Sequence, residues 1–77
     1  MNTQDVLEKF EKMLITADLE YEQIDEETFT IYHASELDNT KRVLLIEGFN
    51  WGLSNHKVRQ IYKNEGNEKT TVRVIRR

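Results

Sequence analysis

Residues 6–17 read VLEKFEKMLITA, the clearest structural pattern in this chain. Apolar side chains recur there at spacings of three and four, which places them on one stripe of an α-helix. Asn2 or Thr3 can cap the first turn, and Asp5 adds a negative charge that stabilises a helix N-terminus. The pattern therefore predicts a helix over residues 3–17, with one apolar face that packs on other elements.

The residues after this helix predict a pair of strands. Apolar side chains fall on alternate positions in 19–25 and in 28–34, which is the spacing of β-strands. If the polar turn at 25–28 joins them in a hairpin, Tyr21 lies opposite Tyr32. Both faces of this hairpin then carry apolar side chains, and one helix cannot cover both faces.

The second half of the chain predicts further strands. Residues 41–49 predict another strand, in which apolar side chains fall on successive positions (43–46) rather than on alternate ones, as is typical of a central strand covered on both faces. Residues 54–64 fit either a short helix or a strand, and we favour a strand that forms a hairpin with another over 70–76. The expected fold class is therefore α+β, with an N-terminal helix packed on a four- or five-stranded, mainly antiparallel sheet. A short second helix near 54–64 is the alternative.

Length and composition indicate a single globular domain over residues 1–77. The sequence has 38% hydrophobic and 32% charged residues, proportions that suit a folded domain better than a disordered one. It contains no Cys, so its stability must come from one core, with or without a partner chain. The longest apolar run, at 43–46, is far shorter than the roughly 20 residues that span a membrane. With no export signal, the cytoplasm is the expected compartment.

Motifs for catalysis, metal binding and cofactor binding are missing from the sequence. His33 and His56 do not have the spacing of a zinc site. The acidic turn at 25–27 lacks the alternating oxygen ligands and the central Gly of an EF-hand loop. The sequence has three glycines and no glycine-rich phosphate-binding loop. We therefore expect a binding protein rather than an enzyme, with no cofactor and no metal.

The distribution of charge is the most informative feature of the sequence. Residues 1–40 contain eleven acidic and two basic side chains, whereas residues 41–77 contain nine basic and three acidic ones. The net charge of −3 thus combines a strongly acidic half with a basic half. Either the two halves fold so that their charges interleave, or one of them forms a charged binding surface.

The acidic half predicts a surface that binds a basic protein. Its candidate residues cluster around the predicted hairpin and the turn that follows it: Glu20, Glu22, Asp25, Glu26, Glu27, Glu36 and Asp38. In length, composition and lack of Cys the chain resembles small acidic phage-encoded inhibitors, some of which imitate the charge of DNA. This resemblance implies a modulator that binds and inhibits a basic host protein, with nucleic-acid mimicry as one means.

The basic half predicts an alternative function, nucleic-acid binding through contacts to phosphates and stacking on bases. The candidate residues are Trp51, Lys57, Arg59, Lys63, Arg73, Arg76 and Arg77. An order of helix, three strands and helix over residues 3–65 resembles the double-stranded-RNA-binding domain. The basic run that this family carries at the start of its second helix is represented here only by the stretch 54–57, with one Lys. The negative net charge also opposes attraction to a polyanion.

A third expectation is a homodimer, which is compatible with either binding function. An apolar face that one helix leaves uncovered usually marks an interface. The candidate interface residues are Tyr21, Tyr32, Leu44 and Ile46.

Overall fold

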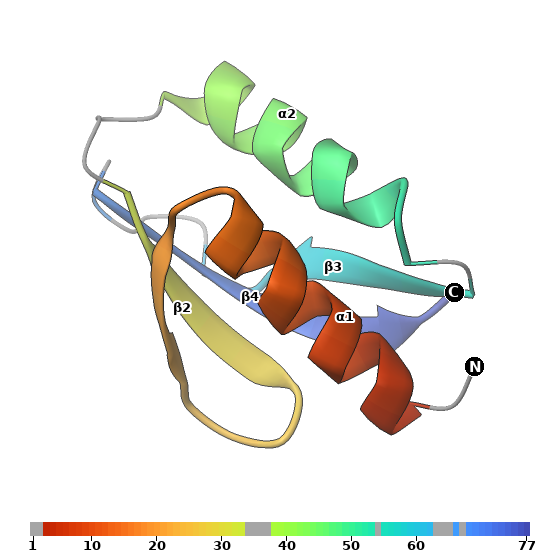
Figure 1. Cartoon of the computed structure of the whole chain (residues 1–77). Coiled ribbons are helices and arrows are strands. Elements are labelled where there is room, and N and C mark those ends of the chain that lie inside the picture. The colour runs from red at the N-terminus through yellow and green to blue at the C-terminus, as the bar shows by residue number, and fades with distance from the viewer. Residues whose placement is uncertain (1–2, 34–37, 54, 63–65, 67) are drawn as a thin grey trace.

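The described residues form two helices and four strands in this computed structural model, which confirms the α+β class. In chain order the elements are α1 (Thr3–Thr16), β1 (Glu20–Gln23), β2 (Thr28–Tyr32), α2 (Asn39–Asn50), β3 (His56–Gln60) and β4 (Lys69–Arg76). The strands form one antiparallel sheet in the order β1-β2-β4-β3, and both helices cover the same face of it (Figure 1). The structure describes residues 3–33, 38–53, 55–62, 66 and 68–77.

The helix predicted from the first apolar stripe is confirmed as α1. Its buried apolar side chains are Val6, Leu7, Phe10 and Leu14. The helix ends where Asp18 takes a left-handed conformation with a φ of 58°. The N–H of Leu19 then donates to the carbonyl of Leu14 (3.0 Å), a type of contact that satisfies the last free carbonyls of a helix.

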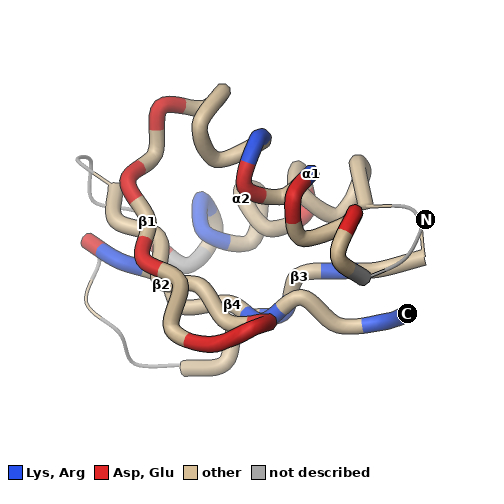
Figure 2. Tube along the Cα trace, turned by 60° about the horizontal axis from the view of Figure 1, so that its bottom comes forward, with Lys and Arg blue, Asp and Glu red and all other residues tan. Residues whose placement is uncertain are grey.

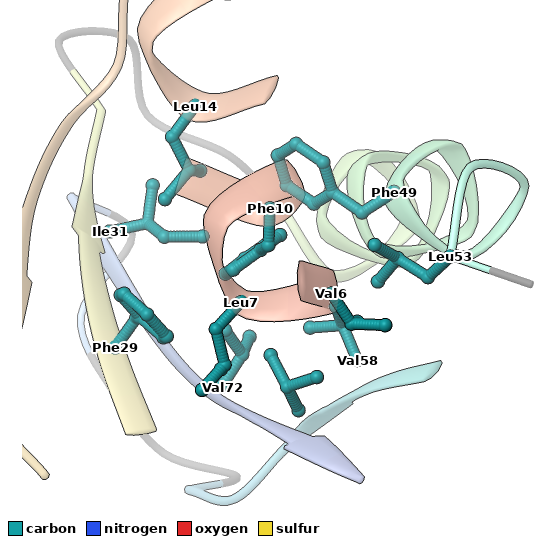
Figure 3. Close-up of a cluster of buried hydrophobic side chains, with 11 residues drawn as sticks. Val6, Leu7, Phe10, Leu14, Phe29, Ile31, Phe49, Leu53, Val58 and Val72 are labelled. Carbon is teal, nitrogen blue, oxygen red and sulfur yellow. The ribbon is translucent and has the colours of Figure 1, made fainter. Parts of the chain in front are cut away.

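The core lies between the two helices and the sheet (Figure 3). Phe10 is at its centre, because its ring meets those of Phe29 and Phe49 edge-on at centroid distances of 5.2 and 5.1 Å. Such edge contacts add about 0.5–1.5 kcal/mol each to the effect of burial. The other buried apolar side chains are Val6, Leu7, Leu14, Ile31, Leu53, Val58, Val72 and Val74. Side chains from α1, β2, β3, β4 and the C-terminal end of α2 thus share one core.

The strand predicted over residues 41–49 is wrong, because this segment forms the helix α2. Its start is fixed by Asp38, whose Oδ1 accepts a hydrogen bond from the N–H of Lys41 (2.9 Å), as an N-cap residue does. A short apolar run has no period that separates a helix from a buried strand. The element order is therefore helix, two strands, helix, two strands. It differs from the helix, three strands and helix that resembled the double-stranded-RNA-binding domain.

The favoured hairpin in the last third of the chain is confirmed, and the alternative short helix near 54–64 is wrong. β3 occupies part of that stretch and pairs antiparallel with β4, with Val58 opposite Val74. Val58 and Val74 are both buried under the helices, and their neighbours alternate to the outer face of the sheet.

The pairing predicted between β1 and β2 is wrong by one residue. Tyr21 lies opposite Ile31 rather than Tyr32, because three residues, 25–27, form the loop instead of four. A shift of one residue moves every side chain of a strand to the other face. Tyr21 therefore joins the helix-covered face, and Tyr32 lies on the outer face.

The outer face of the sheet is polar, so the expectation of two apolar faces does not hold. At its centre the hydroxyls of Thr30 and Thr71 hydrogen-bond to each other (3.0 Å). Thr28 and Arg73, which lie opposite each other on β2 and β4, continue this polar face. On the helix-covered face, Thr70 lies opposite Ile31, and its Oγ1 hydrogen-bonds with His33 Nε2 (3.1 Å). Both helices can therefore pack on one side without leaving an apolar sheet face on the other.

Candidate functional site

α1 lies between two grooves of different chemistry. A helix turns about 100° per residue, so side chains three or four positions apart share a flank. The flank toward the β1–β2 hairpin carries Glu8 and Glu11, whereas the flank toward α2 carries Lys9 and Lys12. The charges of α1 are thus sorted to its two sides.

The groove between α1 and the β1–β2 hairpin, here named the acidic groove, has a volume of about 450 Å³. Its lining residues are Gln4, Leu7, Glu8, Glu11, Gln23, Glu26 and Glu27. Glu8, Glu26 and Glu27 are exposed and Glu11 is half-buried, whereas Leu7 is 8% exposed and adds an apolar part to the lining. Within the described residues, no group of three or more acidic or His side chains is arranged to hold a metal ion. The groove thus offers separate carboxylates around an apolar patch.

Hydrogen bonds around Asp25 fix the turn that brings Glu26 and Glu27 to this groove. The N–H of Glu27 donates to Asp25 Oδ1 (2.9 Å), and the Thr28 hydroxyl also bonds this carboxylate. Arg73 of β4 donates from Nε to Thr28 Oγ1 (3.3 Å). The Glu27 N–H first, then the Thr28 hydroxyl and the charge of Arg73, hold the pKa of Asp25 below its usual value of 3.8.

Replacing Asp25 with Asn is expected to remove a pH-dependent part of the stability. Because folding lowers the pKa of this carboxyl, its stabilisation is present above the unfolded pKa of 3.8 and is lost as the pH falls through the folded pKa. Thermal unfolding of both proteins between about pH 2 and pH 6 checks this expectation. The difference in Tm between the wild type and Asp25→Asn should become smaller toward about pH 2. A difference that stays constant with pH would contradict this expectation.

Only part of the predicted acidic surface comes together at the groove. Glu26 and Glu27 line it, and Asp25 supports their turn. Glu20 and Glu22 lie on the outer face of β1, where Glu22 accepts a hydrogen bond from the Tyr32 hydroxyl (3.3 Å). The remaining predicted acidic residues are Asp38, which caps α2, and Glu36, which lies outside the described residues.

Glu8 and Glu11 of the acidic groove were missed by the sequence prediction. Figure 2 shows acidic positions along α1 as well as along β1 and in the turn that follows it. Their three-residue spacing on the predicted helix was the available signal, since it predicts that both point to one flank. The packing of that flank beside the turn at 25–27 cannot be predicted from any local pattern.

The predicted basic surface is divided between two parts of the protein. Arg59 lies directly opposite Arg73 on the outer face of the sheet, with Lys57 on the same face of β3. At the other part, Arg77 donates to the carbonyls of Asn50 (2.7 Å) and His56 (2.9 Å), so it holds the chain end against α2. Trp51 is 90% exposed and lines a hollow together with Arg77. Of the remaining candidates, Arg76 is the last residue of β4, and Lys63 lies outside the described residues.

The four predicted interface residues do not share one surface. Tyr21 faces the core, where its ring lies 6.0 Å from that of Phe29, and Tyr32 points to the outer face. Leu44 is exposed on α2, and Ile46 is half-buried against the core. The continuous apolar sheet face on which the homodimer prediction was based is therefore not formed by these four residues.

Within the described residues, no helix has both the length and the apolar character needed to span a membrane. No protein-family model, curated protein or solved structure matches the chain.

Proposed function

We propose that the protein is a non-catalytic binding module that receives a basic segment of a partner protein in the acidic groove. The observation that carries this proposal is the meeting of two separate elements. Glu8 and Glu11 of α1 lie beside Glu26 and Glu27 of the β1–β2 turn, at one groove of about 450 Å³. A concave surface lined by one sign of charge attracts and orients a partner of the opposite sign.

The lining of the groove suits the side chain of Arg or Lys. Such side chains pack their aliphatic stems on apolar surface while the charged head stays among polar groups. Leu7 offers the apolar contact, and Gln4 and Gln23 add hydrogen-bonding groups beside the carboxylates. Within the described residues, the structure records no ion pair to any of the four carboxylates. They are therefore free to accept the charge-assisted hydrogen bonds that Arg forms with carboxylates.

The partner class follows from this chemistry. A cytoplasmic host protein whose basic surface otherwise contacts nucleic acid has the required charge, and a bound module would cover that surface. The protein would then act as an inhibitor that replaces phosphates with carboxylates. The carboxylates that line the groove support mimicry of the charge of a nucleic acid.

Two double variants with the same change in net charge test the proposal. The groove variant is Glu26→Lys with Glu27→Lys, and the matched control is Glu20→Lys with Glu22→Lys on the outer face of β1. The probe is a fluorescent peptide of alternating Arg and Ala, measured by anisotropy at about 0.15 M salt. We expect the groove variant to bind at least tenfold more weakly, about 1.4 kcal/mol or more. The control should change less than threefold, about 0.65 kcal/mol.

Equal losses in both variants would contradict the proposal, because the peptide would then respond to net charge alone. Circular dichroism of each variant separates lost binding from lost folding. All four positions are exposed, so neither variant should unfold.

A second candidate function, nucleic-acid binding, is favoured by one observation. Arg59 and Arg73 face each other on adjacent strands, a like-charge pair that is destabilising until an anion lies across it. In the same assay, a labelled single strand of DNA or RNA is the competing probe. If the wild-type protein binds that strand tightly and Arg59→Glu with Arg73→Glu removes the binding, the basic face carries the function instead.

A further inference from the structure

α2 differs from an ordinary amphipathic helix, because a charged side chain is buried and neighbouring apolar side chains are exposed. Arg42 is buried, with 2% of its surface exposed, whereas its neighbours Val43 and Leu44 are 52% and 62% exposed. A helix that is apolar on both sides is typically covered on both sides. The core covers one side of α2, and the other side carries exposed apolar surface of the kind that marks an interface.

A second groove runs between this exposed side of α2 and α1, here named the apolar groove. Its volume is about 530 Å³, and its lining includes Met13, Leu44, Leu45 and Phe49. Gly48 also lines it, and apart from its own turn of α2 no described atom lies within 4 Å of the place where a Cβ would stand. A partner backbone can therefore approach α2 closely at this position.

The charges at the edge of the apolar groove indicate what fits it. Lys9 and Lys12 border it on the α1 side, and they are the two basic residues of the acidic half of the sequence. Among the residues that the structure describes, no Asp or Glu lines it. A segment in this groove therefore meets apolar side chains along its centre and positive charge along one edge.

We propose that the apolar groove docks an amphipathic helix of a partner protein, with acidic residues along the edge that faces α1. A groove walled by two helices suits a helix with apolar anchors at i, i+3 or i+4, and i+7. The acidic residues would lie near Lys9 and Lys12, whose long side chains reach across the groove edge. This site goes beyond the proposed function, because it lies on the other flank of α1 and selects the opposite charge.

Three peptides test the charge selection. The first is a helical peptide of about 14 residues with Leu anchors and Glu on one edge, a length near the limit for a stable isolated helix. The second replaces each Glu with Lys, and the third has the first composition in scrambled order. We expect the Glu peptide to bind at least tenfold more tightly than the other two. Equal binding of the Glu and scrambled peptides would overturn the proposal.

Variants of the protein locate the site. Gly48→Leu fills the open space of the groove and should weaken binding of the Glu peptide at least tenfold, whereas the smaller Gly48→Ala should change it less than threefold. Lys9→Glu with Lys12→Glu should reverse the preference toward the Lys peptide. Glu26→Lys with Glu27→Lys should change the affinity for the Glu peptide less than threefold, so failure of this site and failure of the proposed function are told apart. If Gly48→Leu leaves the affinity unchanged, the docking site is elsewhere.

Sedimentation of the unliganded protein distinguishes the other occupant, a second copy of this chain. If the wild-type protein forms a dimer, we expect the Gly48→Leu variant to form the same dimer, because the interface would lie outside the apolar groove. A wild-type dimer that this variant converts to a monomer would overturn the proposal, since a second copy would then fill the groove.

Discussion

Phe10→Ala is expected to lower the free energy of unfolding by about 3–5 kcal/mol, the usual range for truncation of a buried Phe. The side chain is fully buried, and its ring makes edge contacts with two rings from different elements, Phe29 and Phe49. Neither neighbour can fill the space without breaking its own packing. A domain of this length has roughly 4–12 kcal/mol of stability in total, so the variant will be close to unfolding.

Urea titration of the wild type, Phe10→Ala and Ile15→Ala measures this effect. Ile15 lies on the same helix but is 65% exposed, so its truncation should change stability by about 0.5 kcal/mol or less. The comparison separates the loss of core packing from any change in helix propensity. A loss below about 1 kcal/mol for Phe10→Ala would mean that the stripe of α1 is not the core of the folded protein.

The elements with a clear period were predicted well, because period is a local property. The stripe of α1 and the alternating residues of β2 and β4 each occur within a few turns or pleats. The segment that forms α2 was predicted wrongly for the same reason, since Val43 to Ile46 are apolar at every position and have no period. Its N-cap at Asp38 was the missed signal, and an acidic residue just before an apolar run also fits an ordinary turn.

The acidic groove could be predicted only in part, because it forms between elements. The loop length at 25–27 decides which face each side chain takes, and one residue more or less reverses the outcome. Glu26 and Glu27 were found because they are neighbours in sequence. Glu8 and Glu11 join them through packing of α1 on the sheet, which depends on the whole core. The apolar groove needs α2 as one wall, so an error in that element hid it.

Arg42→Ala is the second substitution with a large expected effect, a loss of about 2–4 kcal/mol in the free energy of unfolding. The guanidinium lies inside the fold and donates from Nη2 to the carbonyl of Gly66 (3.0 Å), with a longer contact to that of Lys69 (3.5 Å). These contacts join α2 to the segment that leads into β4. The Ala variant loses both the donor and the packing of the aliphatic stem.

Arg42→Met separates these two contributions, because Met keeps most of the buried volume and removes only the charge and the donors. Two opposing effects then compete. The Gly66 carbonyl loses a charge-assisted hydrogen bond of about 1.5–3 kcal/mol. Against this, Met relieves the burial of a cation whose Nε has no hydrogen-bond partner among the described residues.

We expect the hydrogen bond to dominate, since its acceptor stays behind when the donor is removed, whereas a buried ion is replaced without cost only when its partner is replaced too. Arg42→Met should therefore lose about 1–3 kcal/mol in a urea titration, less than Arg42→Ala. A Met variant as stable as the wild type would show that the free-energy cost of burying the guanidinium equals the stabilisation from its hydrogen bonds. The stability of α2 would then rest on its apolar contacts with the core, and the tie to β4 would contribute no net stability.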